Sequence, residues 1–557
     1  MARPQNPVNI ARTGQNETSQ IYRHPALRPP LNTPNGDYAL QFTVVSGELP
    51  AQDVDAVVVN LFSGVDKPDG ATGAIDAATG NTITALIEAG EITGRSGELT
   101  VIHTLGEAYF GNGAYSGFAP KRVVVAGLGK ADKFDLDDVR TVSATTVRRL
   151  RNLGVKSAAT VIHGAGAVGI EPGDAAEAMV EGAILGLYKF DKYKSKKQSG
   201  DDDAEDDKTL ESLIIVEPDT AGVADVEAGV TRAIAFADAA ALARDLVNEP
   251  PNVMTPTKLA EEAERVAGAA DGLSITILER ADAEKMGMGA FLGVAQGSRE
   301  PLKIIRIDYA GDAGHADDNL WLIGKGITFD SGGLSLKTSS GMETMKSDMA
   351  GVASVIAAIQ AIAVIGPKIN VTALCLATEN MPGGGAQRVS DVVTAMSGKT
   401  IEVLNTDAEG RLTLADALAY ARENGASRMV DVATLTGGIV TALGRGNSGA
   451  FSNDDDLVDA LIAAGARRGE PIWRLPLDDV SKRQNRSKIA DIKNTGGRPA
   501  HATTGAHFIG EFAGDTPWVH LDIAATAMTD SLSGWRTPGA TGVPTRTLIQ
   551  LVIDLAK

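Results

Sequence analysis

Residues 321–337 read WLIGKGITFDSGGLSLK. The first half of this stretch is a nearly unbroken apolar run, which is typical of a strand buried on both faces. The run then passes into a glycine-rich loop that carries an aspartate and a lysine. Because ligands of α/β sheets bind at the carboxyl ends of the strands, this loop is where a functional site would lie.

Similar apolar segments surround this strand and alternate with helical patterns. In the second part of the chain they are KIIRIDY (303–309), VTALCLAT (371–378), RMVDVATLT (428–436) and WVHLDIA (518–524). In the first part they are AVVVNLF (56–62), RVVVAGLG (122–129) and SLIIVEP (212–218). Continuous apolar strands separated by helices indicate sheets covered on both faces. We therefore expect an α/β fold with two domains, each a sheet covered by helices.

The length of 557 residues is more than a single hydrophobic core normally organises. Residues 1–36 are rich in Pro, Asn, Gln and Arg, and we predict a disordered tail. An N-terminal α/β domain is expected over 37–225 and a second domain over 226–557, close to where two prolines end a helical pattern. Residues 192–208, KYKSKKQSGDDDAEDDK, are predicted to be a solvated acidic loop insertion in the first domain.

Composition narrows the choice of partners and compartment. A net charge of −19 argues against nucleic acid as the main partner, since phosphate binding needs a concentrated basic surface. The single cysteine, Cys375, excludes an intramolecular disulfide and a thiolate zinc cluster. The sequence starts without the apolar core of a signal peptide, and its longest nearly apolar stretch, 352–365, is shorter than the roughly 20 residues that span a membrane. We expect a cytoplasmic protein without a membrane partner.

Carboxylates gather in the glycine-rich segments that follow the strands. Asp330 and Asp348 lie in and after the opening stretch, and Asp407 and Glu409 lie in NTDAEGRL (405–412). Each could cap a helix or line a turn by itself. Together, four converging carboxylates would repel one another unless cations neutralise them, and two divalent metals would do so. Lys325 could join such a site only as the neutral amine.

Other motifs are weaker. Residues 164–169 match G-x-G-x-x-G after a strand. The dinucleotide fingerprint also needs an acidic residue at the end of a second strand about 20 residues later, and here that distance falls in a helical pattern that ends at Tyr188, so we interpret the match as chance. The sequence contains neither H-E-x-x-H nor G-x-S-x-G, which leaves zincin chemistry and a serine nucleophile elbow unsupported.

Several strings resemble the signatures of the leucyl (cytosol) aminopeptidase family, over residues from about 230 to the C-terminus and more loosely over 38–230. They are GKGITFDSGGLSLK (324–337), MKSDMAG (345–351), NTDAEGRL (405–412), NEPPNVMTP (248–256), DVATLTG (431–437), NTGGRPA (494–500), HLDIA (520–524) and GATG (539–542). The resemblance implies a metal-dependent aminopeptidase whose C-terminal domain is catalytic. It would hydrolyse the N-terminal peptide bond of peptides with a free α-amine, through a hydroxide bridged by the metals.

The resemblance also implies roles for individual residues. Matching the family's motifs residue by residue places one metal on Lys325, Asp330, Asp348 and Glu409, and a second on Asp330, Asp407 and Glu409. The metals would be zinc or manganese, with magnesium or cobalt possible. Lys337 matches the catalytic lysine, and Arg411 matches the arginine that holds a bicarbonate ion. Met345, Thr434 and Gly437 match positions of the pocket for the first side chain of the substrate. The family assembles as a homohexamer, a dimer of trimers, so we expect the same here.

Two other classes of protein fit the sequence less well. A phosphoester hydrolase would show more basic residues for the phosphate and histidine ligands, and neither is seen. An oligomeric DNA-binding or structural protein is disfavoured by the complete ligand set and by the acidic composition.

Overall fold

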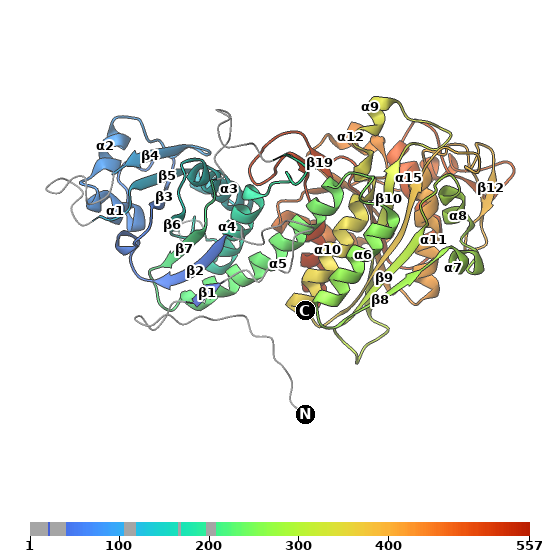
Figure 1. The fold of residues 1–557 in the computed structure, drawn as a ribbon, viewed down its shortest axis with the longest axis horizontal. Coiled ribbons are helices and arrows are strands. Elements are labelled where there is room, and N and C mark those ends of the chain that lie inside the picture. The colour runs from blue at the N-terminus through green and yellow to red at the C-terminus, as the bar shows by residue number, and fades with distance from the viewer. Residues whose placement is uncertain (1–19, 23–39, 105–117, 165–168, 196–207, 557) are drawn as a thin grey trace. The chain divides into compact units, whose positions relative to one another are not determined.

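The structure is a computed structural model that describes residues 20–22, 40–104, 118–164, 169–195 and 208–556 (Figure 1). The chain divides into two compact units, one of residues 1–237 with 531–537 and the other of residues 238–530 with 538–557. Helix α5 (Val223–Asn248) begins in the first unit and ends in the second. Most of the predicted acidic insertion, 196–207, lies outside the described residues.

The first unit contains a seven-stranded sheet in the order β1-β2-β7-β6-β3-β5-β4. Its strands are β1 (Gln20–Tyr22), β2 (Gln41–Ser46), β3 (Ala56–Phe62), β4 (Leu99–His103), β5 (Arg122–Gly129), β6 (Ser157–Thr160) and β7 (Ser212–Glu217). The inner strands pair in parallel, and β1 and β4 close the two edges in antiparallel pairing. Its helices are α1 (Gly70–Ala78), α2 (Thr82–Glu88), α3 (Leu136–Asn152) and α4 (Pro172–Leu187), and its short 3-10 turns are η1 (Leu49–Ala51) and η2 (Ala131–Lys133).

Both faces of this sheet are covered, as the apolar strands predict. Alternate residues of β3 belong to two different cores, so that Val58 faces the side of α3 and α4 while Val57 and Val59 face the side of α1 and α2. Strand β1 lies within the predicted disordered tail, and it pairs with β2 from Gln20 to Tyr22. The sequence gives no strand signal there, because three residues are too short for periodicity to register. The rest of the predicted tail lies outside the described residues.

The second unit contains an eight-stranded sheet in the order β16-β15-β18-β14-β10-β11-β9-β8. Its strands are β8 (Leu273–Leu278), β9 (Lys303–Ala310), β10 (Asn319–Asp330), β11 (Asn370–Asn380), β14 (Arg428–Ala433), β15 (Ser448–Ser452), β16 (Ile472–Arg474) and β18 (Trp518–Asp522). The central strands β11, β10, β14 and β18 are parallel. Two small sheets complete the unit, formed by β12 (Val392–Thr394), β13 (Thr400–Glu402) and β17 (Ile492–Lys493), and by β19 (Met528–Thr529) and β20 (Gly539–Ala540).

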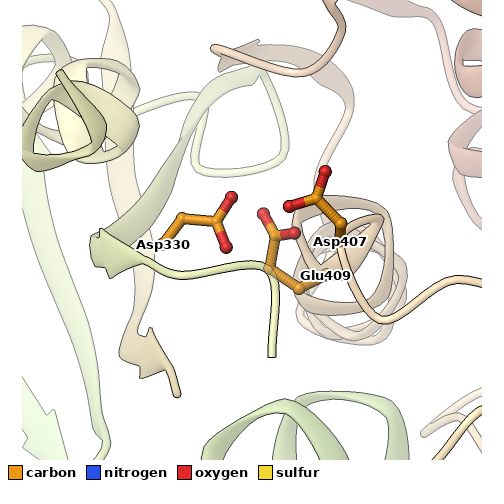
Figure 2. A group of neighbouring side chains, drawn as sticks. All are labelled: Asp330, Asp407 and Glu409. Atoms are coloured by element: carbon orange, nitrogen blue, oxygen red, sulfur yellow. The ribbon is translucent and has the colours of Figure 1, made fainter. Parts of the chain in front are cut away.

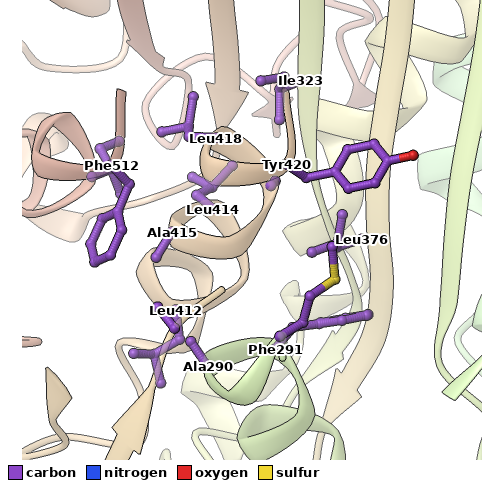
Figure 3. Close-up of a cluster of buried hydrophobic side chains, with 14 of the residues drawn as sticks. Ala290, Phe291, Ile323, Leu376, Leu412, Leu414, Ala415, Leu418, Tyr420 and Phe512 are labelled. Atoms are coloured by element: carbon purple, nitrogen blue, oxygen red, sulfur yellow. The ribbon is translucent and has the colours of Figure 1, made fainter. Parts of the chain in front are cut away.

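Helices cover both faces of this sheet as well. They are α6 (Pro256–Ala269), α7 (Arg280–Lys285), α8 (Gly289–Ala295), α9 (Ser339–Met342), α10 (Ala350–Ile365), α11 (Glu409–Glu423), α12 (Gly437–Leu443), α13 (Asp455–Arg467), α14 (Asp479–Arg483), α15 (His501–Ala513) and α16 (Thr545–Leu555), with the 3-10 turn η3 (Met345–Met349). On one face, α11 packs between the sheet and α15, and Leu414 and Leu418 lie in one buried cluster with Ile323, Leu376 and Phe512 (Figure 3). On the other face, α10 packs on β10 and β14 with α6 and α16 beside it.

Helix α10 approaches β10 more closely than any side chain would allow. A Cβ atom added to Gly324 of β10 would lie 2.4 Å from the Cα of Val352, and one added to Gly351 would lie 2.0 Å from the carbonyl oxygen of Val432. Two glycines therefore let backbone meet backbone at the start of α10. This close approach brings Lys325, next to Gly324, towards Asp348, which precedes α10.

The stretch Ser339–Ile365 has the length and hydropathy of a membrane span, but 83% of its most apolar window is buried inside the unit. Such burial is that of a core helix.

Candidate active site

The predicted ligands come from three elements that meet at the carboxyl end of β10. Asp330 is the last residue of β10, Asp348 lies in η3, and Glu409 is the first residue of α11. Asp407 stands in the turn before α11. Oxygen atoms of Asp330, Asp407 and Glu409 all lie within 4.8 Å of one another, and Figure 2 shows the three carboxylates converging. The strand-end position expected from the sequence is where the cluster lies.

Lys325 is buried at the inner side of this cluster. Its Nζ lies 2.8 Å from Asp348 Oδ2 and 2.8 Å from Glu409 Oε1. It also donates a hydrogen bond to the carbonyl oxygen of Thr434 at 3.2 Å. Burial alone would lower the pKa of Lys325, but the charges of Asp348, Glu409 and Asp330 outweigh it and raise the pKa. The amine therefore occupies a place where positive charge is strongly favoured.

Lys337 faces the outer side of the same cluster. Its Nζ lies 2.8 Å from Asp330 Oδ2 and 2.5 Å from Asp407 Oδ1. Burial opposes its charge, yet the charges of Asp330 and Glu409 raise the pKa of Lys337 above its ordinary value. The ammonium form is therefore held on the side of the cluster where 18% of its side chain is exposed.

The carboxylates respond to burial and to their neighbours in different directions. Burial raises the pKa of Asp348 well above its ordinary value and raises the pKa of Asp407 to about 6. Burial and the charge of Glu409 raise the pKa of Asp330. Burial also acts to raise the pKa of Glu409, but Lys325 and Lys337 outweigh it and lower that pKa. Burial and mutual repulsion therefore disfavour full ionisation of the four carboxylates beside only two lysines.

The cluster also has a spare oxygen acceptor. Glu409 is only 1% exposed, and its Oε2 has no hydrogen-bond partner. By contrast, Asp348 Oδ2 and Asp407 Oδ1 are paired with the ammonium groups of Lys325 and Lys337. Buried acceptors without partners are costly, and carboxylate oxygens are the ligands that hard divalent cations prefer. These residues therefore fit a divalent metal site.

Neighbouring groups hold the carboxylates in place. Asp330 Oδ1 accepts hydrogen bonds from Asn380 Nδ2 and from the Gly332 backbone, both at 2.8 Å. Thr434 Oγ1 donates to Asp348 Oδ1 at 2.7 Å. Asn380 is missing from the sequence-based site, because it ends the neighbouring strand β11 and no motif marks it. Such outer hydrogen bonds orient metal-binding carboxylates.

Sterics explain why a glycine stands two residues after Asp330. Gly332 has a φ of +86°, and a Cβ there would lie 2.7 Å from Asp407 Oδ1. Any other residue would be strained and would press into the cluster.

Arg411 lies in α11, two residues after Glu409, and is 1% exposed. Its Nη1 donates to the carbonyl oxygen of Asn494 at 2.7 Å, and its Nη2 lies 3.0 Å from His501 Nε2. Among the described residues no carboxylate forms an ion pair with Arg411, and its Nε has no partner. Burial lowers the pKa of Arg411 to about 10, against the more distant charges of Glu409 and Asp522. A buried guanidinium without a carboxylate partner is suited to hold an anion.

The three predicted pocket residues are placed differently. Thr434 contacts the cluster through Asp348 and Lys325. Met345 begins η3 and is partly exposed. Gly437 begins α12, and a Cβ there would meet no atom within 4 Å. Their shared role as a substrate pocket stays a prediction.

Comparison with known proteins agrees with this geometry. Two family models match the chain: the catalytic domain of the cytosol aminopeptidase family over residues 241–549, and the N-terminal domain of that family over residues 58–197. A probable cytosol aminopeptidase of Solibacter usitatus (strain Ellin6076) is 43% identical over 515 residues, which are 92% of this chain and 99% of the relative. One of Alkaliphilus oremlandii (strain OhILAs) is 40% identical over 518 residues, which are 93% of this chain and 100% of the relative.

Solved structures show the same likeness. The bottromycin maturation enzyme BotP in complex with Mn superposes with a TM-score of 0.77 at 33% identity, covering 90% of this chain and 100% of that one. A mutant of tomato leucine aminopeptidase superposes with a TM-score of 0.81 at 29% identity, covering 94% of this chain and 98% of that one. Matching domains, relatives over nearly the whole length and an acidic cluster at the strand ends lead to one conclusion. This chain belongs to the cytosol aminopeptidase family and is a metal-dependent aminopeptidase.

Proposed function

We propose that the cluster binds two divalent cations and that the chain removes N-terminal residues from peptides with a free α-amine. Lys325, Asp330, Asp348 and Glu409 would hold one cation, and Asp330, Asp407 and Glu409 would hold the other. The observation that carries this proposal is the convergence of oxygen atoms of Asp330, Asp407 and Glu409 within 4.8 Å of one another, together with a Glu409 Oε2 that has no hydrogen-bond partner. When bound, such cations act as Lewis acids that activate water and polarise the scissile carbonyl.

Lys337 is the proposed oxyanion donor. Its ammonium group is favoured by Asp330 and Asp407, and it is partly exposed, so it can reach a substrate. A fixed cation at this point stabilises the negative charge that develops on the carbonyl oxygen. Lys325 is more deeply buried, and it would serve the cluster as a ligand only after losing a proton.

Arg411 is the proposed holder of a bicarbonate ion. Its buried guanidinium keeps a positive charge without an ion pair among the described residues, and its planar fork matches a planar carbonate-type anion. Such an anion, held by Arg411, would supply general acid–base chemistry beside the cluster.

The identity of the metals and of the substrate is less constrained. We propose zinc or manganese, with magnesium or cobalt as alternatives, and the similar enzyme BotP has been solved in complex with Mn. Met345, Thr434 and Gly437 are the proposed contacts for the first side chain of the substrate.

The proposed compartment is the cytoplasm, in keeping with relatives named cytosol aminopeptidases, and we propose neither a membrane nor nucleic acid as a partner. The domain division at residue 226 is likewise proposed.

The activity is tested with one chromogenic aminoacyl anilide and its N-acetylated form. We expect hydrolysis of the free amine only, loss of hydrolysis with a chelator, and recovery on adding back divalent metal. Asp407→Asn should lower both activity and bound metal, whereas Asp459→Ala, a change at an exposed acid of α13, should alter neither. Equal cleavage of the acetylated compound would refute the proposal.

A further inference from the structure

His501 is a partly exposed residue that contacts Arg411, and no motif in the sequence predicts this contact. It is the first residue of α15, 90 residues from Arg411 in sequence, and its Nε2 lies 3.0 Å from Arg411 Nη2. A guanidinium has only donors, so the imidazole nitrogen must accept this hydrogen bond. His501 is therefore neutral in this contact, with its proton on Nδ1.

The surroundings keep it neutral. Burial, followed by the positive charge of Arg411, lowers the pKa of His501 to about 4. A protonated ring would place two cations in contact. His501 thus differs from the usual partner of a buried arginine, since it restrains the guanidinium without neutralising it.

The guanidinium has five N–H donors, and two neutral acceptors restrain it from different sides. The Asn494 carbonyl accepts from Nη1 and His501 accepts from Nη2, while Nε has no partner. These two hydrogen bonds fix the orientation of the guanidinium. Its positive charge and its remaining N–H donors stay available for an anion.

The backbone is shaped to hold this pair. His501 and Gly505 lie one turn apart on α15 and share the face towards Arg411. A Cβ at Gly505 would lie 3.2 Å from both Nε and Nη2 of Arg411, and one at Gly438 would lie 3.1 Å from His501 Cβ. Ala500, just before the helix, has a φ of +51°, a conformation that is costly for alanine. Close approach of the backbone at Gly505 and Gly438 therefore keeps His501 next to Arg411.

We propose that His501 is a positioning residue that holds Arg411 for a carbonate-type anion. The neutral imidazole accepts a hydrogen bond from the guanidinium and leaves its positive charge uncompensated. This inference rests on the role proposed above for Arg411. It predicts that changing His501 alters the response to bicarbonate and leaves the metals and peptide binding intact.

The experiment compares His501→Ala, His501→Gln and the wild-type enzyme with its metals bound. The readouts are kcat and KM for an aminoacyl anilide, the bicarbonate concentration that gives half-maximal activation, the rise in melting temperature that bicarbonate causes, and metal content. For His501→Ala we expect the half-maximal bicarbonate concentration to rise roughly tenfold, the fold-change that a hydrogen bond to a charged group supplies. The bicarbonate-dependent rise in melting temperature should shrink with it, since bound ligand stabilises the folded state.

His501→Gln offers a carbonyl oxygen to Arg411, and it should recover most of the bicarbonate response. His507→Ala, a change of the other histidine on α15, is the matched control and should behave as wild type. The inference is overturned if His501→Ala keeps the wild-type bicarbonate response, if His501→Gln is as impaired as His501→Ala, or if His501→Ala loses metal and raises KM to the same degree as it changes kcat.

The Arg411→Ala variant distinguishes failure of this inference from failure of the proposal that Arg411 holds bicarbonate. If that variant keeps the bicarbonate response, the anion role of Arg411 fails and the inference fails with it. If Arg411→Ala loses the response while His501→Ala keeps it, Arg411 retains its role and only the inference about His501 is wrong.

Discussion

Single residues at the strand ends show how a charged cluster is balanced. Two lysines lie among four acidic side chains, and each lysine contacts two of them. Lys325 is almost fully buried whereas Lys337 reaches the partly exposed side, which supports the two different tasks proposed for them. Burial decides which one can meet a substrate.

The Lys337→Ala substitution tests this division of tasks. We expect kcat to fall by roughly 10²-fold while two metals stay bound, because one oxyanion donor is lost and no ligand is. Steady-state kinetics and metal analysis by mass spectrometry measure the two effects. Lys368→Ala, at an exposed lysine, is the control that should change neither. A loss of metal in Lys337→Ala would instead identify Lys337 as a ligand.

The burial of His163 in the first unit leads us to predict that the stability of this unit depends on pH. It is buried, accepts a hydrogen bond from Asn60 Nδ2 at 3.1 Å when neutral, and burial lowers its pKa to about 4. The unfolded chain binds a proton on this residue below about pH 6.5, and the native state does not do so until about pH 4. Stability should therefore fall as the pH is lowered through that window, by about 2 kcal/mol between pH 7 and pH 5.

The measurement is the urea-unfolding midpoint of the first unit at pH 7 and pH 5. His163→Gln removes the titrating group, so the difference between the two pH values should become smaller even if the variant is less stable at both. His103→Gln, at an exposed histidine of β4, should keep the wild-type difference. An unchanged pH dependence in His163→Gln would contradict the assignment.

At the scale of elements, the site depends on how closely α10 packs against β10. The apolar sequence of both elements predicts that they are buried, and they are. Their distance is set by Gly324 and Gly351, where the backbones touch. The position of Asp348 relative to Lys325 follows from that contact.

Gly351→Ala tests the close approach. The added Cβ would lie 2.0 Å from the Val432 carbonyl oxygen and 3.0 Å from the Lys325 nitrogen, and both are backbone atoms that cannot rotate away. We expect a loss of about 1–3 kcal/mol of stability and weaker retention of metal, because α10 must shift. Gly268→Ala is the matched control in the exposed part of α6, where a Cβ meets nothing within 4 Å, and it should be neutral or stabilising by about 0.5–1 kcal/mol. Thermal unfolding and metal content decide between them.

At the scale of the whole molecule, each unit is assembled from distant parts of the chain. Residues 531–537 belong to the first unit, where Trp535 is fully buried and donates a hydrogen bond to Asp137 Oδ1 at 2.8 Å. The site likewise joins β10, η3 and α11 within the second unit. Folding of the C-terminal region is therefore a condition for both units.

The assembly of the whole protein is the remaining prediction. We expect a homohexamer, a dimer of trimers, which would enclose the sites and limit access to short or unfolded peptides. Light scattering on the purified protein should give six times the 57.7 kDa of one chain. A fully active species with the mass of a single chain would refute the assembly and leave the chemistry untouched.

The sequence by itself determined the α/β class, most of the buried strands and the set of acidic residues at their ends. These are local signals: apolar runs mark buried strands, and glycine-rich turns after them carry the charged groups. The contents of the motifs were enough to predict the acidic cluster, because Asp330, Asp407 and Glu409 converge at one edge of one sheet.

Only the tertiary structure decided which groups complete that site. Asn380 reaches Asp330 from the neighbouring strand, and His501 reaches Arg411 across 90 residues of sequence. The placing of 531–537 with the first unit and the pairing of β1 with β2 are of the same kind. Periodicity reports how a segment is buried but not which distant segment it meets, and these contacts arise from the packing of elements that are far apart along the chain.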